Sequence, residues 1–268
     1  DDLRLKRDLL VNVQPDADAE VFALRLNDRR EVHLTGNHPV LTIHGWKKVD
    51  DLWPGVRVAV PRSLPCQSVG EVPESAIIIT AYMISEGSMG PKSGNSAGFT
   101  NANLLLVNDM DQALRSHGMK LHKVSSIDYR IAQLSSERPY GRSQGRGRNY
   151  HYGEWRHFCE TYKLIRSKSR DKSLPPWVFT LKPALLQLFL NRLFAGDGCY
   201  WITTRTNYPM VSYASTSPIL RRQIAHLLRR FGYASRERND NRHEVTLTPA
   251  DSQKFLREIG IFGRENKG

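Results

Sequence analysis

Two apolar segments of this sequence end in the same way, and this shared ending restricts the fold more than any other feature. Residues 182–201, KPALLQLFLNRLFAGDGCYW, carry apolar side chains at helical spacing and then read Gly-Asp-Gly around Asp197. Residues 76–90, AIIITAYMISEGSMG, run in the same way from an apolar helix into Ser-Glu-Gly around Glu86. We expect Gly198 to end its helix in the left-handed conformation that glycine adopts freely. The chain therefore contains two apolar helices that each finish on an acidic residue.

The position of these acids indicates a metal site. A carboxylate at the C-terminal end of a helix faces the negative end of the helix dipole, which costs roughly 0.3–1 kcal/mol. If the two helix ends meet, Glu86 and Asp197 also repel each other, and a metal ion or a shared proton must relieve the repulsion. We favour a divalent cation, Mg²⁺ or Mn²⁺, because such ions bind carboxylate, water and phosphate oxygens. Considered singly, each acid is only an exposed helix end.

The elements that follow the two acids repeat. Each acid is followed by a predicted strand, helix, strand and strand, and the acids lie 111 positions apart, from residue 86 to residue 197. This order predicts an α+β fold of two similar halves related by pseudo-twofold symmetry, with the acidic helix ends at the axis. The predicted elements are 98–101, 104–117, 120–125 and 128–134 after the first acid, a helix at 154–165, and 210–215, 217–231, 233–238, 243–248 and a last helix at 252–259 after the second.

The part before the repeat is predicted to be all β. Residues 21–34 read as two strands around a polar turn, and residues 40–43 and 56–60 read as further short strands. The following stretch contains Pro, Ser and Gly and reads as a connection between domains. The predicted divisions are therefore a β domain at 1–65, a linker at 66–75, and an α+β domain at 76–268 with halves of about 76–165 and 182–268.

The net charge of +12 is distributed unevenly along the chain. Residues 1–75 hold 10 Lys/Arg and 12 Asp/Glu, a net of −2, so the remaining 29 basic and 15 acidic groups give residues 76–268 a net of +14. A basic surface around an acid pair indicates a polyanionic substrate, although charge alone suits a merely soluble basic protein equally well.

Composition also bears on location. The three cysteines have no paired or zinc-like spacing, which is typical of packed thiols in a reducing compartment. No apolar run approaches the ~20 residues of a membrane span, and no signal-peptide pattern opens the sequence. We expect an intracellular, cytoplasmic or nucleoid-associated protein without a membrane partner.

The motif pair and the repeat together resemble a known family. The segments TAYMISEG (80–87) and NRLFAGDG (191–198) resemble the two signature helices of LAGLIDADG homing endonucleases of the dodecapeptide type found inside inteins. The likeness covers roughly residues 76–268. It implies two αββαββα-like halves that give strands to a DNA-binding saddle, in a monomer that cuts a long asymmetric double-stranded site. It also implies metal-assisted hydrolysis of DNA phosphodiesters, with Glu86 and Asp197 each serving one strand.

Two positions depart from the family pattern. Arg192 stands where family members often place a small residue, so we expect either that its side chain extends past the helix interface or that the two helices cross slightly differently. Many members also place a basic residue near the acids. The aligned positions here are Ala102 and Thr216, so that residue is unassigned.

The N-terminal part carries a second resemblance. The segment TGNHPVLTIHGWKKVDDLWPGVRVAVPR (35–62) resembles the second sequence block of inteins, which form the self-splicing Hint fold. The resemblance implies that Thr35 and His38 polarise the scissile peptide bond. It also implies a first Cys or Ser and a terminal His-Asn, where this sequence has Asp1 and Lys267-Gly268, so we expect no splicing from the sequence as given. The alternative for the turn is a polar connection between strands.

The candidate DNA contacts lie on the predicted strands and in one loop. Six strand residues suit a major groove, with a solvated sheet face as the alternative: Lys120, His122, Arg130, Gln133, Arg236 and Arg238. Residues 135–152 are rich in Gly, Arg and Tyr and offer Arg138, Arg142, Arg146 and Arg148 to phosphates.

Three functions remain open at this point. The first is a site-specific double-strand endonuclease of intein origin. The second is a sequence-specific DNA-binding protein that keeps the fold without cleavage, which the unassigned basic residue favours. The third is a protein-splicing element whose endonuclease is vestigial.

Overall fold

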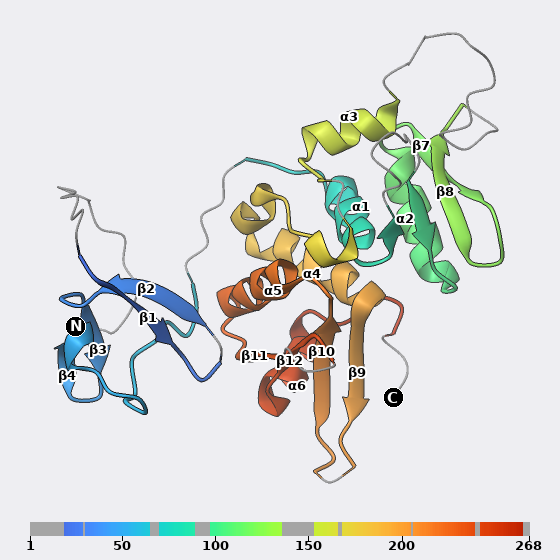
Figure 1. Ribbon diagram of the computed structural model, residues 1–268. Coiled ribbons are helices and arrows are strands. Elements are labelled where there is room, and N and C mark those ends of the chain that lie inside the picture. Colours follow the sequence, from blue (N-terminus) through green and yellow to red (C-terminus); the bar gives the residue numbers. More distant parts are fainter. Residues whose placement is uncertain are drawn as a thin grey trace.

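The computed structural model of this 268-residue chain describes residues 19–28, 30–64, 70–88, 97–135, 153–165, 168–204, 206–238 and 242–264. Within these residues the fold is mixed α+β. A small β part lies to one side of two larger units, each built from helices and one antiparallel sheet (Figure 1). In the described residues we find no helix that is long and apolar enough to cross a membrane.

The N-terminal part consists of two separate hairpins. Strands β1 (Val21–Arg25) and β2 (Glu31–Thr35) pair antiparallel, as do β3 (Pro39–Thr42) and β4 (Gly45–Lys48), and a short 3₁₀ turn, Val49–Asp51, follows. The strand predicted at 56–60 is reduced to a single bridge between Thr42 and Val58, so that prediction was wrong. Pro54 and Pro61 bracket this stretch and lack the N–H groups that would extend a ladder.

This N-terminal part has almost no core of its own. Among described residues 19–28 and 30–64, only Gly36, Thr42 and Val49 are buried, while Trp46 is 70% exposed. It contacts the second larger unit through Asp28, whose carboxylate accepts bonds from Arg30 at 2.7 Å and from Arg229 at 3.4 Å.

The two larger units share one order of elements. The first contains α1 (Glu74–Ser85), β5 (Gly87–Ser88), β6 (Gly98–Thr100), α2 (Leu104–Arg115), β7 (Met119–Lys123), β8 (Asp128–Gln133) and α3 (Glu154–Thr161). The second contains α4 (Pro183–Asp197), β9 (Gly198–Ile202), β10 (Pro209–Ala214), α5 (Pro218–Arg230), β11 (Ser235–Arg238), β12 (Glu244–Leu247) and α6 (Pro249–Glu258). The sheet orders, β5-β6-β8-β7 and β9-β10-β12-β11, correspond strand for strand. The 3₁₀ turns Ser169–Asp171 and Pro176–Thr180 lie between the units.

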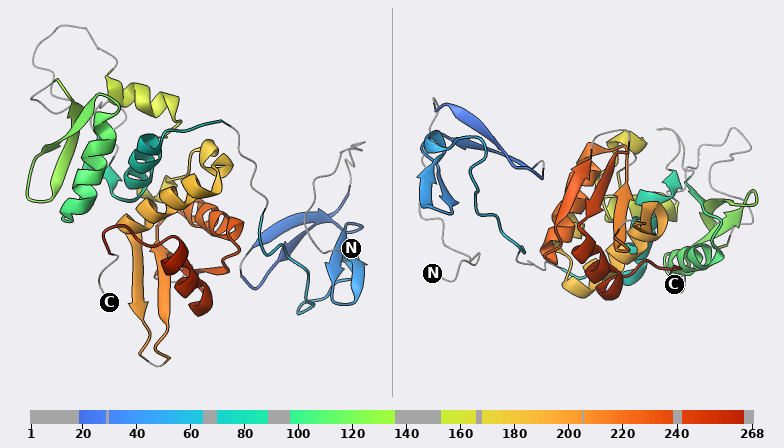
Figure 2. Two further views of the ribbon diagram at one scale, coloured as in Figure 1. Left: turned by 180° about the vertical axis from the view of Figure 1, so that it is seen from behind. Right: turned by 90° about the horizontal axis from the view of Figure 1, so that it is seen from below.

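Helices α1 and α4 pack together at the centre, with the two sheets on either side (Figures 1 and 2). Nine of the twelve residues of α1 are buried, so this helix has no polar face and must lie inside the protein. The buried apolar residues of both units form one continuous cluster. Burial of these two helices therefore holds the units together.

Arg192 of α4 extends past the helix interface, which is the first of the two alternatives that the sequence left open. Its guanidinium bonds the Asp109 carboxylate of α2, with Nε 2.8 Å from Oδ2, and lies 3.8 Å from the ring centroid of Phe262. Tyr82 of α1 donates to the same carboxylate at 2.8 Å. This cluster links both units beside the central helices.

Several element boundaries differ from those predicted, each for a local reason. Helix α3 ends at Thr161 rather than 165, because Lys163 takes a left-handed φ of 53°. Helix α6 begins three residues earlier than expected, because the Thr248 side chain caps it by accepting the Asp251 N–H. Strand β9 was missed altogether, since it follows the acid of α4 without an intervening turn.

The glycines after the two acids are needed for close approach, and the left-handed ending predicted for Gly198 was wrong. Gly198 has φ −78° and ψ 149°, an extended conformation that any residue can adopt. A Cβ there would lie 2.8 Å from the Phe194 Cα, because the backbone after Asp197 stays close to the preceding turn of α4. At Gly87 a Cβ would lie 2.6 Å from the Met83 Cα in the same arrangement.

We expect Gly196→Ala to destabilise the contact between α1 and α4. The added Cβ would meet the Ser85 side chain and lie 2.9 Å from the Glu86 Cγ. Overpacking costs about 1–3 kcal/mol, against a gain of about 1 kcal/mol in helix propensity, so urea unfolding should show a net loss of up to about 2 kcal/mol. Ser85→Gly in the same chain should restore part of it, with Ser85→Gly alone as control. Unchanged stability in Gly196→Ala would contradict this close packing.

Candidate active site

Glu86 and Asp197 come together at the meeting point of the central helices. Asp197 is the last residue of α4, and Glu86 follows α1 with its N–H bonded to the Tyr82 carbonyl at 2.8 Å. Gly196 packs against Ser85 and Glu86, so the two helix ends are in contact. The structure therefore places the two predicted acids side by side, one from each unit.

Burial disfavours the charged forms of both carboxyls, and at Glu86 the neighbouring acid adds to this effect. Burial raises the pKa of Glu86, and the Asp197 charge raises it further, while Lys172 and Arg264 act in the opposite direction. Burial also raises the pKa of Asp197, to about 6, against the opposing effect of the Lys172 ammonium. Glu86 is half-buried and Asp197 is exposed, so both carboxyls remain open to solvent.

Lys172 is a basic residue next to the acids, the kind of residue that the two motifs and the repeat left unassigned. It lies just after the 3₁₀ turn between the units, and its Nζ donates to the Ile84 carbonyl at 2.6 Å and to the Ser85 carbonyl at 3.3 Å. Burial lowers its pKa, and the Asp197 and Glu86 charges oppose that effect. Because the lysine precedes the second motif helix and stands outside the repeated elements, neither motif nor repeat could point to it.

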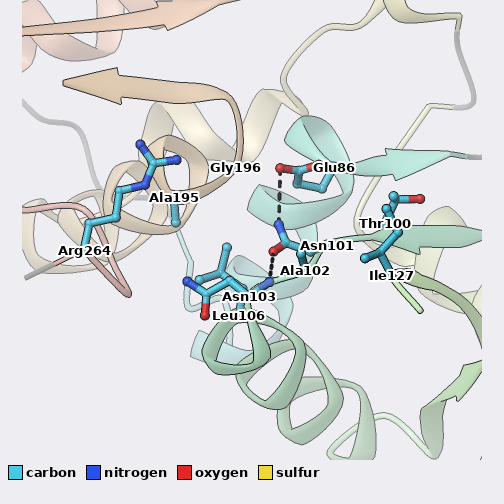
Figure 3. Close-up of a pocket in the computed structure, with 10 residues that line it drawn as sticks. All are labelled: Glu86, Thr100, Asn101, Ala102, Asn103, Leu106, Ile127, Ala195, Gly196 and Arg264. Carbon is cyan, nitrogen blue, oxygen red and sulfur yellow. Dashed lines mark hydrogen bonds between the residues drawn. The ribbon is translucent and has the colours of Figure 1, made fainter. Parts of the chain in front are cut away.

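A cavity of about 390 Å³ opens beside Glu86. Asn101 projects into it and donates from Nδ2 to Glu86 Oε1 at 3.3 Å, while Arg264 faces the acid from the C-terminal segment (Figure 3). The Arg264 guanidinium also donates to the Gly198 carbonyl at 2.9 Å. The remaining lining residues are Thr100, Ala102, Asn103, Leu106, Ile127, Ala195 and Gly196.

Asp197 has a different neighbour. The side chain of Tyr213 on β10 is fully buried, and its hydroxyl donates to Asp197 Oδ2 at 3.5 Å. Burial and the charge of Asp197 raise the pKa of this phenol well above its ordinary value, so the hydroxyl stays protonated and remains a donor.

The donor set at this site fits Mg²⁺ or Mn²⁺ better than a structural zinc ion. Two carboxylates meet here, and the part of the chain that the structure describes contains no cluster of three or more His, Cys, Asp or Glu side chains suited to a metal. Structural zinc requires about four such ligands, whereas Mg²⁺ is held by one or two carboxylates with water and substrate phosphate completing its shell. A cation bound between the two carboxylates would offset their mutual repulsion.

We expect Asp197→Asn to be more stable than the unmodified protein at neutral pH in EDTA. An acid whose pKa rises on folding, here from 3.8 to about 6, contributes stability that is complete below pH 4 and is lost as pH rises through 6. The melting temperature of the variant should therefore exceed that of the unmodified protein at pH 7.5 and converge with it near pH 4. A constant difference across this range would contradict the assignment.

Five of the predicted DNA contacts lie on sheet faces turned away from the helices. His122 pairs with Arg130 across β7 and β8, and their neighbours Tyr129 and Ile131 point into the core. In the second unit the side chain of Glu237 points inward and is buried, while its neighbours on β11 point outward. The outward residues are Lys120, His122 and Arg130 in the first unit and Arg236 and Arg238 in the second.

Gln133 does not share that surface. It lies three positions after Arg130 and therefore points to the opposite side of β8, where its Nε2 donates to Glu154 Oε2 at 2.7 Å. The structure thus assigns it a contact with α3, which corrects its placement among the DNA-facing residues. Arg138, Arg142, Arg146 and Arg148 lie outside the described residues.

Thr35 and His38 lie in one tight turn of the N-terminal part. The His38 N–H donates to the Thr35 carbonyl at 3.0 Å, and the Thr35 hydroxyl donates to Asn37 Oδ1 at 2.7 Å. The His38 side chain is exposed. This turn and the acid pair belong to different parts of the molecule (Figure 1).

Comparison with known proteins connects the second unit to one family. Residues 184–266, which run from α4 past α6, match the model of a LAGLIDADG-like domain. Among solved structures, I-DmoI in complex with DNA and Mn gives a TM-score of 0.43 at 12% identity, covering 70% of this chain and 96% of that chain. Full-length DUF199/WhiA from Thermatoga maritima gives 0.40 at 14% identity, covering 73% and 59%.

Curated relatives match nearly the whole chain. Replicative DNA helicase DnaB of Rhodothermus marinus is 27% identical over 276 residues, covering 98% of this chain and 28% of the helicase. Protein RecA of Mycobacterium tuberculosis is 27% identical over 259 residues, covering 92% and 30%. A DNA gyrase subunit of Mycolicibacterium flavescens is 28% identical over 262 residues, covering 91% and 44%. The chain thus spans less than half the length of each of these relatives.

Proposed function

We propose that this chain is a site-specific double-strand DNA endonuclease of the LAGLIDADG homing type that hydrolyses phosphodiesters with a divalent metal. The observation that carries the proposal is the meeting of Glu86 and Asp197 at the ends of two buried helices, one from each sheet-bearing unit. Burial raises the pKa of both acids and the Asp197 charge raises that of Glu86 further, which favours a functional site over a structural one.

The residues of the site have distinct roles in this proposal. The carboxylates of Glu86 and Asp197 would hold Mg²⁺ or Mn²⁺, which supplies a more acidic bound water and stabilises negative charge on the phosphate. In the hydrolysis a water oxygen would bond to phosphorus and lose a proton to solvent, while the bond from phosphorus to the 3′-oxygen would break and that oxygen would take up a proton from solvent. Lys172 and Arg264, which both act on the charge of Glu86, offset the negative charge that accumulates beside the acids.

The basic sheet faces provide the binding surface. Lys120, His122 and Arg130 extend outward from one sheet, and Arg236 and Arg238 from the other, so one duplex could contact both sheets with its phosphates near the acids. Two unlike faces suit a long asymmetric site read by a monomer. The charge of residues 76–268, a net of +14, supports binding to a polyanion.

The pattern of relatives supports an intein origin. One stretch of about the length of this chain matches DnaB, RecA and a gyrase protein, three differently named proteins, and fills only 28–44% of each. A segment shared by such different proteins is expected of an insertion that moves between hosts. The N-terminal turn with Thr35 and His38 would then belong to a Hint portion, and a splicing element with a vestigial nuclease is the second candidate function.

Cleavage of a plasmid library with randomised inserts tests the proposal. With Mg²⁺ the protein should cut one long site on both strands, and EDTA should prevent cutting. Salt-sensitive retention of one sequence without cleavage would instead establish the non-cleaving DNA-binding protein.

A further inference from the structure

Glu86 and Asp197 occupy equivalent positions in the two units, but the side chains next to them differ. In the first sheet Phe99 pairs with Gly87, and in the second Tyr213 pairs with Gly198, so these aromatic residues are counterparts next to the two acids. Both rings are fully buried. Tyr213 carries a hydroxyl that donates to Asp197, whereas a phenylalanine ring at the matching position has no polar atom to donate.

The same comparison holds two residues further on, just past the end of each strand. Asn101 follows Phe99 and Ser215 follows Tyr213, and each side chain accepts an N–H from the residue two positions on, at 2.8 Å from Asn103 and 3.2 Å from Ser217. These residues therefore make corresponding turns before α2 and α5. Asn101 has in addition an amide that donates to Glu86 Oε1 at 3.3 Å.

The acids themselves differ in length. Glu86 carries one methylene more than Asp197, so its carboxylate reaches further from the helix end. A longer side chain has more rotamers to restrict, and the Asn101 amide restricts them. The shorter Asp197 is contacted by the phenol of the fully buried Tyr213, whose ring packs against Phe194 with ring centroids 5.3 Å apart. Each acid is thus contacted by a different group, Asp197 by Tyr213 on β10 and Glu86 by Asn101 just after β6.

We propose that Tyr213 and Asn101 are positioning residues for different acids, so that each governs hydrolysis of a different DNA strand and cleavage proceeds through a nicked intermediate. This inference rests on the proposed endonuclease function. It adds that the two DNA strands are cut at unequal rates. Substitution of either Tyr213 or Asn101 would change the ratio of these rates. Neither residue has to touch the DNA for this effect, since each acts through the carboxylate that it holds.

The test uses a duplex of the identified target with a different label on each strand, cut under single-turnover conditions. Tyr213→Phe should slow one strand about tenfold, as expected for loss of one hydrogen bond to a charged group, and leave the other near its normal rate. Asn101→Leu should slow the opposite strand. Open-circular plasmid should accumulate in both variants.

Two controls separate positioning from damage to the fold. Tyr129→Phe removes a hydroxyl from β8 beside Phe99 and should leave both strand rates unchanged. Melting temperature and retention of the duplex in EDTA should stay close to the unmodified protein in all three variants. Asn101 is only half-buried, so its variant provides the test even if Tyr213→Phe folds poorly.

The outcomes are distinct. Opposite strand effects in Tyr213→Phe and Asn101→Leu would establish the inference. Equal slowing of both strands by either variant, or slowing of the same strand by both, would overturn it while the unmodified protein still cuts. Absence of cleavage by the unmodified protein would instead refute the proposed function on which the inference depends.

Discussion

Glu86→Gln and Asp197→Asn should each reduce double-strand cleavage by about a thousandfold or more. Each substitution keeps the size of the side chain and removes the negative charge that a divalent cation requires. Loss of several kcal/mol of transition-state stabilisation corresponds to roughly this factor, because every 1.4 kcal/mol is tenfold. The measurement is the rate of linear-product formation from a plasmid that carries the selected site, with Mg²⁺ present.

Glu74→Gln is the matched control for these variants. Glu74 begins the same helix that Glu86 follows, is exposed, and lies at the opposite end of α1 from the acid pair. It should cut at the normal rate. If Glu86→Gln or Asp197→Asn cut as fast as this control, the acid pair would not be the active site, and another group of residues would have to be sought.

Arg221→Met should lower the free energy of unfolding by about 3–5 kcal/mol. Arg221 and Glu237 form an ion pair with Nε 3.1 Å from Oε1, and their side chains are only 2% and 9% exposed. Removal of the arginine leaves a buried carboxylate without its partner, which is far more costly than loss of a surface pair. The same guanidinium donates to the Ser215 carbonyl, so α5 would also lose its link to the end of β10.

The neighbouring arginine provides the control. Arg222 lies on the same helix but is exposed, and Arg222→Met should change the urea midpoint little. Replacement of both partners, as Arg221→Met with Glu237→Leu, should recover much of the loss because no buried charge is left. If Arg221→Met were as stable as Arg222→Met, the buried pair would not hold α5 on the sheet.

Much of the site was open to prediction because its signals are local. The helical spacing of apolar residues and the Ser-Glu-Gly and Gly-Asp-Gly endings are contained in short segments, and they identified α1, α4 and both acids. The outward direction of Arg130 and the inward direction of Gln133 also follow from strand alternation, since positions three apart point to opposite faces.

The sequence by itself determined the order of elements, the two acidic helix ends and the uneven charge, because each depends on residues that are neighbours in the chain. Only the tertiary structure decided which groups surround the acids. Lys172 precedes the second motif helix and contacts the end of α1, while Arg264 approaches from the C-terminal segment, so no short pattern contains them. Gly87 and Gly198 are also required by close packing rather than by a left-handed turn. Contacts between residues distant in sequence arise only when burial of the two apolar helices brings their ends together.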